Sequence, residues 1–77
     1  MKLKWWVGNL DGRNQGLVVE TSKEKARKIS HTGLADFNNY WSEERGPIPV
    51  WAKIGVLYKR SFDYRFNQDD PRNGWKS

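Results

Sequence analysis

Apolar and polar side chains alternate at the start of the chain and predict a β-hairpin. The alternating positions are Leu3, Trp5 and Val7, with Lys2, Lys4 and Trp6 between them. A period of two is typical of a strand that buries one face. Residues 17–21 (Leu-Val-Val-Glu-Thr) form a second apolar run after the turn-rich stretch 11–16. Two such runs around a glycine-containing loop indicate a hairpin, and a loop of this length leaves its register open.

The segment after the hairpin predicts one or two short helices. Residues 21–24 (Thr-Ser-Lys-Glu) match the capping box that begins a helix, and Gly33 is a suitable end. Apolar residues then recur at helical spacing from Leu34 to about Glu43, which predicts a second helix. Residues 22–41 also fit a helix-turn-helix loosely, so one helix, two helices and a helix-turn-helix all stay open.

The strongest alternation in the chain runs through residues 52–66. The even positions are mostly apolar or aromatic and the odd positions mostly polar. Fifteen residues exceed the usual length of a strand. The segment therefore either breaks into two strands near Arg60 and Ser61 or continues as one bent strand. After it, residues 67–77 are a turn-rich tail that Trp75 fastens to the domain.

These elements add up to a single α+β domain over residues 1–77. We expect an antiparallel sheet of three or four strands, with one helical segment of one or two short helices inserted after the first hairpin. The expected core consists of Leu3, Trp5, Val7, Leu17, Val19, Ile29, Leu34, Phe37, Ile54, Val56, Tyr58 and Phe62. A small sheet has edges that can pair with another chain, so a homodimer through residues 17–20 or 52–66 stays open.

Composition and reactive residues argue against an enzyme. A chain of 77 residues buries only about 60% of its unfolded surface, too little for a deep cavity between domains. It has no cysteine and one histidine, which excludes thiolate chemistry and a multi-histidine metal site. Ser30 and His31 are adjacent and would not face each other on a helix, and Glu43 with Glu44 is typical of a solvated helix end. We expect no cofactor and no catalysis.

The hydropathy pattern also bears on location. No apolar run is long enough to span a membrane. The apolar start of the chain stops at Gly8 without the apolar core of a secretion signal. We therefore expect a cytoplasmic protein without a membrane partner.

The net charge of +5 favours an anionic partner. Four cations, Lys23, Lys25, Arg27 and Lys28, lie within six residues and are opposed only by Glu24. They suit phosphate contacts, although lysine-rich helices are also common as solvated faces. Lys4 belongs to the same positive half of the chain.

The tryptophans are the second candidate feature, because five exceed what a small core needs. Trp6 falls on the polar face of the first strand, and Trp51 shares parity with Lys53 and Lys59. If these rings are exposed, they would stack on a base or anchor a protein interface. Alternatively, they cover the second face of a thin sheet. The expected binding set is Lys4, Trp6, Lys23, Lys25, Arg27, Lys28, Trp51, Lys53 and Lys59.

Three stretches resemble small bacteriophage proteins: residues 17–29 (LVVETSKEKARKI), 37–41 (FNNYW) and 55–60 (GVLYKR). In size, lack of cysteine and sheet-plus-helix plan the chain is similar to small anti-CRISPR and other anti-defence proteins. The resemblance implies a non-enzymatic protein of the host cytoplasm that inhibits or modulates a host protein or ribonucleoprotein complex. Many such inhibitors are acidic mimics of DNA, whereas this chain is basic. It would bind an acidic protein face or, as the alternative function, DNA or RNA through the same surface.

Overall fold

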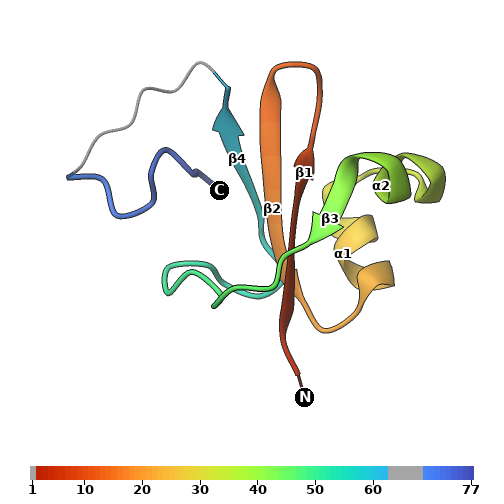
Figure 1. Ribbon diagram of the computed structural model, residues 1–77, viewed down its shortest axis with the longest axis horizontal. Helices are drawn as coiled ribbons and strands as arrows, with labels where there is room; N and C mark the ends of the chain where they lie inside the picture. The colour runs from red at the N-terminus through yellow and green to blue at the C-terminus, as the bar shows by residue number, and fades with distance from the viewer. Residues whose placement is uncertain (1, 63–68) are drawn as a thin grey trace.

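A computed structural model describes residues 2–62 and 69–77, and shows a four-stranded antiparallel sheet with two helices on one face (Figure 1). The strand order is β3-β1-β2-β4. Along the chain the elements are β1 (Lys4–Asn9), β2 (Asn14–Glu20), α1 (Lys23–Ser30), α2 (Leu34–Tyr40), β3 (Trp41–Glu43) and β4 (Leu57–Ser61). The α+β class and the helical segment after the first hairpin are confirmed.

The hairpin closes more tightly than its sequence predicts. Strand β2 already begins at Asn14, and Val7 lies opposite Leu17 in the register. The Asp11 carboxylate stabilises the turn by accepting hydrogen bonds from the backbone N–H groups of Arg13 and Asn14, both at 2.8 Å. Such side-chain turns are typical of aspartate. These bonds, the one from Arg13 first, lower the pKa of Asp11.

Residues 22–41 form two separate helices followed by a strand. The hydroxyl of Ser22 caps α1 by accepting from the N–H of Lys25 at 3.3 Å, so the expected cap one residue earlier is wrong. Helix α1 ends at Ser30 and not at Gly33, and the residue that caps it, His31, has a left-handed φ of 59°. Helix α2 stops at Tyr40 because residues 41–43 pair with β1 as strand β3.

Both faces of the sheet are buried. On one face the helices cover a cluster of Trp6, Val18, Ala26, Phe37 and Trp41. On the other face, residues 44–56 and the C-terminal segment cover a second cluster of Leu17, Val19, Tyr58 and Trp75, and Figure 1 shows these segments on the side away from the helices. Consecutive side chains of a strand point to opposite faces of the sheet. Because both faces are covered, neither the odd nor the even positions of a strand face open solvent throughout.

Four residues expected in the core lie at the surface instead: Leu3, Leu34, Ile54 and Phe62, with exposed fractions from 45% to 57%. Leu3, Ile54 and Phe62 lie just outside strands, and Leu34 is in the first turn of α2. The alternation of apolar and polar residues predicts burial inside a strand, but it does not predict burial where the chain leaves the sheet. Trp6, expected on the open face, is the converse error.

In the described part of the long alternating segment, residues 52–62, one short strand forms, β4. Ile54 makes an isolated parallel bridge to Val19, whereas β4 runs antiparallel to β2, so the chain reverses between them. Gly55 makes this reversal with a φ of 79°, a conformation that glycine adopts without strain. Residues 63–66 of the expected strand lie outside the described residues.

The topology also corrects one predicted dimer interface. Strand β2 pairs with β1 on one side and with β4 on the other, so residues 17–20 have no free edge. Lys59 in β4 exchanges two backbone hydrogen bonds with Lys76, at 2.7 and 2.8 Å. The end of the chain therefore covers part of the outer edge of β4.

The predicted tail is described from residue 69 onward and is built of turns. The carboxylate of Asp70 accepts from the N–H groups of Arg72 and Gly74. Trp75 is 8% exposed within the second cluster, with the guanidinium of Arg60 5.0 Å from the centre of its ring.

Candidate nucleic-acid interface

Trp6 lies in the helix-side core and is not available to a ligand. Its exposed fraction is 2%, and it packs with Ala26 and Phe37. The expectation that it lies on the open face of the first strand is wrong because α1 and α2 cover that face. The parity of β1 instead places Trp5 on the opposite face.

Trp5 lines a surface cavity of about 390 Å³ beside the N-terminal end of β1. The cavity lies between residues 2–5 and the segment 43–48. The indole N–H of Trp5 donates to the carbonyl of Gly46 at 3.0 Å, and the N–H of Glu44 donates to the carbonyl of Trp5 at 2.8 Å. The half-buried ring is thus held in place before any ligand arrives.

The charged residues around this ring are mainly cationic. Lys2, Lys4 and Arg45 line the cavity together with Glu43 and Glu44. None of these five side chains forms an ion pair with another described residue. Three cations beside an aromatic face match the way in which proteins hold a base and its phosphates.

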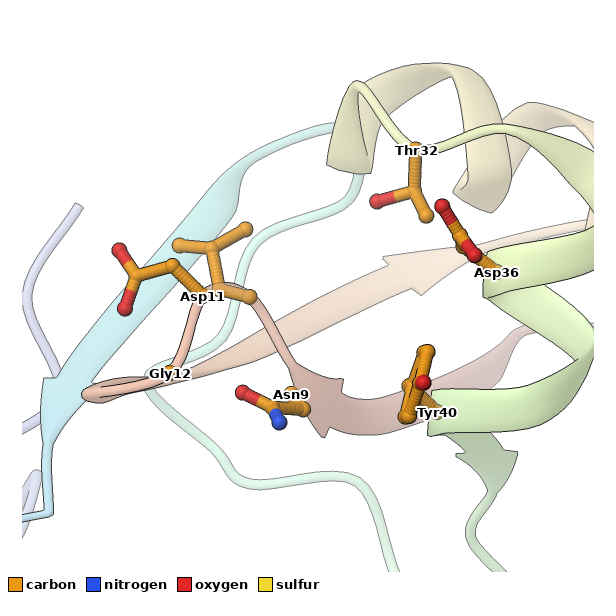
Figure 2. A pocket seen from close by; sticks show the side chains of 7 residues that line it. Asn9, Asp11, Gly12, Thr32, Asp36 and Tyr40 are labelled. Carbon is orange, nitrogen blue, oxygen red and sulfur yellow. The ribbon is translucent and has the colours of Figure 1, made fainter.

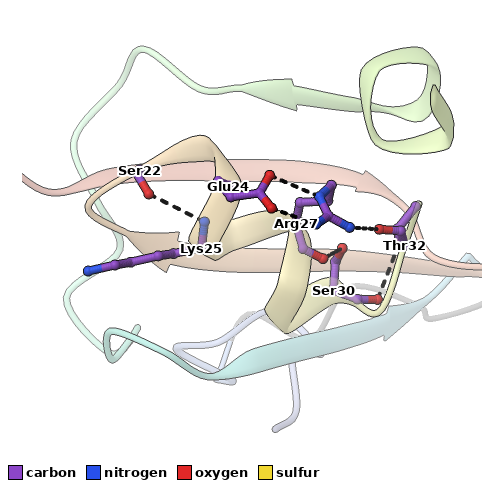
Figure 3. Close-up of polar contacts among 6 residues, drawn as sticks. All are labelled: Ser22, Glu24, Lys25, Arg27, Ser30 and Thr32. Atoms are coloured by element: carbon purple, nitrogen blue, oxygen red, sulfur yellow. Dashed lines mark hydrogen bonds and ion pairs between the residues drawn. The ribbon is translucent and has the colours of Figure 1, made fainter. Parts of the chain in front are cut away.

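Helix α1 presents three further lysines to solvent. Its buried side chains are Ala26 and Ser30, while Lys23, Lys25 and Lys28 are exposed and form no ion pair with a described residue. In Figure 3 the side chain of Lys25 extends away from the polar network of the helix.

Arg27 belongs to that internal network. Its guanidinium donates to both carboxylate oxygens of Glu24, at 3.1 and 2.6 Å, and to the carbonyl of Thr32 at 3.1 Å (Figure 3). The hydrogen bond to Glu24 raises the pKa of Arg27 and lowers that of the carboxyl group. Arg27 is therefore a poor candidate for a ligand contact.

The start of α1 and the Trp5 cavity lie at the same end of the sheet. Lys4 lines the cavity and lies opposite Glu20 in the register, and α1 begins three residues after Glu20. Figure 1 shows the start of β1 and the turn into α1 at the same end. We call Lys2, Lys4, Trp5, Lys23, Lys25 and Arg45 the basic end of the sheet.

The remaining predicted residues lie elsewhere. Trp51 packs edge-on against Tyr58 on the face without helices, with a centroid distance of 5.1 Å, and the guanidinium of Arg72 lies 5.8 Å from its ring centre. Lys53 is exposed in the segment before β4. Lys59 is close enough to the hairpin loop to help lower the pKa of Asp11. The nine predicted residues thus do not form one surface, because the reversal at Gly55 separates Lys53 from Lys59.

Three residues of the basic end, Lys2, Trp5 and Arg45, are outside the predicted binding set. Adjacent tryptophans in a strand must point to opposite faces, but which face the helices cover is not visible in the alternation. Arg45 reaches the cavity only because residues 41–43 leave the expected helix and pair with β1.

Ser30 and His31 each have a local role or position at the end of α1. The Ser30 hydroxyl donates to the carbonyl of Arg27 at 2.6 Å, and His31 is exposed at the end of α1. Over residues 2–62 and 69–77, no three acidic or histidine side chains gather where they could hold a metal ion. Neither α1 nor α2 has the length and hydropathy of a membrane span.

Comparison with protein-family models, with curated proteins and with solved structures gives no match to this chain.

Proposed function

We propose that this protein binds single-stranded nucleic acid at the basic end of the sheet. The observation that carries the proposal is the Trp5 ring, half-buried, fixed by its bond to Gly46 and lined by Lys2, Lys4 and Arg45. One base stacks on the indole, and the neighbouring phosphates meet the three cations. An unpaired strand is favoured because a base stacked within a duplex cannot reach a ring set into a cavity.

The lysines of α1 would meet the strand where it passes around this end of the sheet, because α1 lies on the face opposite Trp5. Lys23 and Lys25 stand at the same end of the sheet and are exposed. They would follow the strand through its phosphates without reading its sequence. Lys28 lies farther along the helix and would add a weaker contact.

As biological context we propose the anti-defence role that the sequence resemblance implies, with the nucleic acid of a host ribonucleoprotein as the direct ligand. The competing hypothesis, a protein interface anchored by indoles, depended on Trp6 and Trp51. Trp6 is buried and Trp51 packs against Tyr58 beneath Arg72. Neither ring offers the free face of a central anchor, which favours the nucleic-acid alternative.

The test is fluorescence anisotropy with labelled oligothymidylate, its RNA equivalent and a duplex. Trp5→Leu should weaken single-strand binding by about 5- to 150-fold, the value of one stacked base, and Trp5→Phe, which keeps a ring but loses the bond to Gly46, should weaken it less. The five proposed phosphate contacts, from the three cations around Trp5 and from Lys23 and Lys25, give a salt slope of about −3.5, which Lys2→Gln should flatten by about 0.7.

Lys59→Gln is the matched control, because it removes the same charge toward the hairpin end of the sheet, where Lys59 is exposed opposite Gly16. Circular dichroism establishes that each variant is folded. The proposal fails if no single strand binds at about 50 mM salt. It also fails if folded Trp5→Leu binds as well as the parent, or if Lys2→Gln and Lys59→Gln weaken binding equally.

A further inference from the structure

A second cavity, also of about 390 Å³, lies at the opposite end of β1. It is lined by Asn9, Leu10, Asp11 and Gly12 from the hairpin and by Thr32, Asp36 and Tyr40 from the helical side (Figure 2). Lys4 and Asn9 begin and end β1, which separates the two cavities by roughly 17 Å at the usual rise of a strand.

The helical wall of this cavity presents a carboxylate and an aromatic ring. Asp36 and Tyr40 are four residues apart on α2, so their side chains lie on the same side of the helix. Asp36 is exposed and has no hydrogen-bond or ion-pair partner among the described residues. Tyr40 is 57% exposed, a large fraction for an aromatic side chain.

Other polar groups complete the lining. Figure 2 shows Thr32 beside Asp36, and Asn9 on the facing wall below the hairpin loop. Their hydroxyl and amide oxygens can accept further hydrogen bonds. The Asp11 carboxylate is already engaged by Arg13 and Asn14, so it adds negative potential without being a free acceptor.

The charge of this cavity is opposite to that of the protein. Two carboxylates and no cationic side chain line it, in a chain with 14 Lys and Arg against 9 Asp and Glu. We propose that it binds an arginine side chain of a protein partner. The planar guanidinium can pair with the Asp36 carboxylate through two N–H groups while its face lies against the Tyr40 ring.

This contact is independent of the proposed nucleic-acid site, because it shares no residue with the basic end. Together the two ends would suit a target that contains both nucleic acid and an arginine-rich protein. Each can fail alone, since Asp36 and Trp5 are tested with different ligands.

The test is an NMR titration of the isotope-labelled full chain with N-acetyl-arginine amide. The lysine derivative and the uncharged citrulline derivative serve as comparisons. We expect millimolar binding of the arginine derivative, with shifts centred on Asn9, Gly12 and Thr32, weaker binding of lysine and none of citrulline. Asp36→Asn should weaken arginine binding by about tenfold, as loss of a charge-assisted pair does. Tyr40→Leu should also weaken it.

Glu43→Gln is the matched control, because it removes one exposed carboxylate at the other end of β1. The proposal is overturned if citrulline binds like arginine, or if Asp36→Asn and Glu43→Gln have equal effects. It is also overturned if free arginine binds and the capped residue within a glycine peptide does not, because the occupant is then a metabolite. Concentration-dependent self-association that Asp36→Asn abolishes would make the occupant a second copy and would refute a separate partner.

Discussion

The indole of Trp41 lies directly over two glycines of the central hairpin, and this makes Gly16→Ala a sharp test of the helix-side core. A Cβ at Gly16 would lie 2.4 Å from Cη2 of Trp41, far inside van der Waals contact. Phe37 stacks on Trp41 with a centroid distance of 5.3 Å and an interplanar angle of 12°. Trp41 is 5% exposed, so it cannot move aside without disturbing the cluster.

The expected magnitude follows from two opposing effects. Overpacking a close-packed core destabilises by about 1–3 kcal/mol. Replacing glycine by alanine inside a strand returns about 0.5–1 kcal/mol through backbone entropy. We therefore expect Gly16→Ala to lower the free energy of unfolding by about 1–2 kcal/mol, which is a large fraction of the stability of a domain this small.

The assay is urea unfolding followed by far-ultraviolet circular dichroism, arranged as a double-mutant cycle with Trp41→Phe. The smaller ring lacks the atoms that approach Gly16, and it loses an indole N–H that has no hydrogen-bond partner among the described residues. Gly16→Ala should thus cost at least about 1 kcal/mol less in the Trp41→Phe background. Additive effects would refute the steric argument.

Two other glycines are the controls for this cycle. A Cβ at Gly12 would have no neighbour within 4 Å, so Gly12→Ala should change stability by less than about 0.5 kcal/mol. A Cβ at Gly8 would lie 2.4 Å from Cγ of Trp41 and 2.6 Å from the backbone carbonyl of Tyr40. Gly8→Ala should destabilise in both backgrounds, because a shorter ring leaves the backbone clash in place.

Three further predictions concern the ends of the elements. Ser22→Ala removes the cap of α1 and should lower the free energy of unfolding by about 1 kcal/mol in urea, whereas Thr21→Ala should cost less. Because folding lowers the pKa of Asp11, its carboxylate stabilises the fold fully above the ordinary carboxyl pKa, and this stabilisation is lost as the pH falls through the folded pKa. The free energy of unfolding should therefore depend less steeply on pH below about pH 4 in Asp11→Ala than in the parent. Trp75→Ala should destabilise by about 3 kcal/mol and release Lys76 from β4, which amide exchange of Lys59 would report.

The class of fold could be predicted because it depends on local patterns that the tertiary structure respects. The hairpin, the first helix and a strand within residues 52–66 are found where the pattern of apolar and polar residues predicts them. The helix ends were less predictable, since Ser22 and Thr21 are both good caps and only the folded chain chooses between them. The change from α2 to β3 was hidden because Trp41 continues the helical spacing while its backbone pairs with Gly8.

The candidate site was harder to predict because the sheet is buried on both faces. The alternation predicts Trp5 in the core and Trp6 at the surface, which is valid for a sheet with one solvated face. Here the helices bury Trp6, while residues 44–56 cover the other face only in part and leave a cavity beside Trp5. The pattern of Lys4, Trp5 and Trp6 fits either tryptophan as the one beside open surface. The path of a loop more than forty residues farther along the chain decides that a cavity remains beside Trp5.

The same loop explains why charge and aromatic surface coincide at one end of the sheet. Glu44 pairs with the backbone of Trp5, and the carbonyl of Gly46 accepts from its indole, so the segment that partly covers the ring also brings Arg45 to it. Loss of the indole bond should therefore free the ring and separate Arg45 from it, while Lys2 and Lys4 stay beside Trp5 at the start of β1 and the sheet remains folded. Because Trp5 holds the segment that carries Arg45, this residue contributes more to ligand affinity than to the stability of the fold. Trp5→Phe keeps an aromatic ring but cannot make the bond to Gly46. If this variant loses more ligand affinity than stability, the site is prearranged. If it does not, Trp5 is only a partly buried ring.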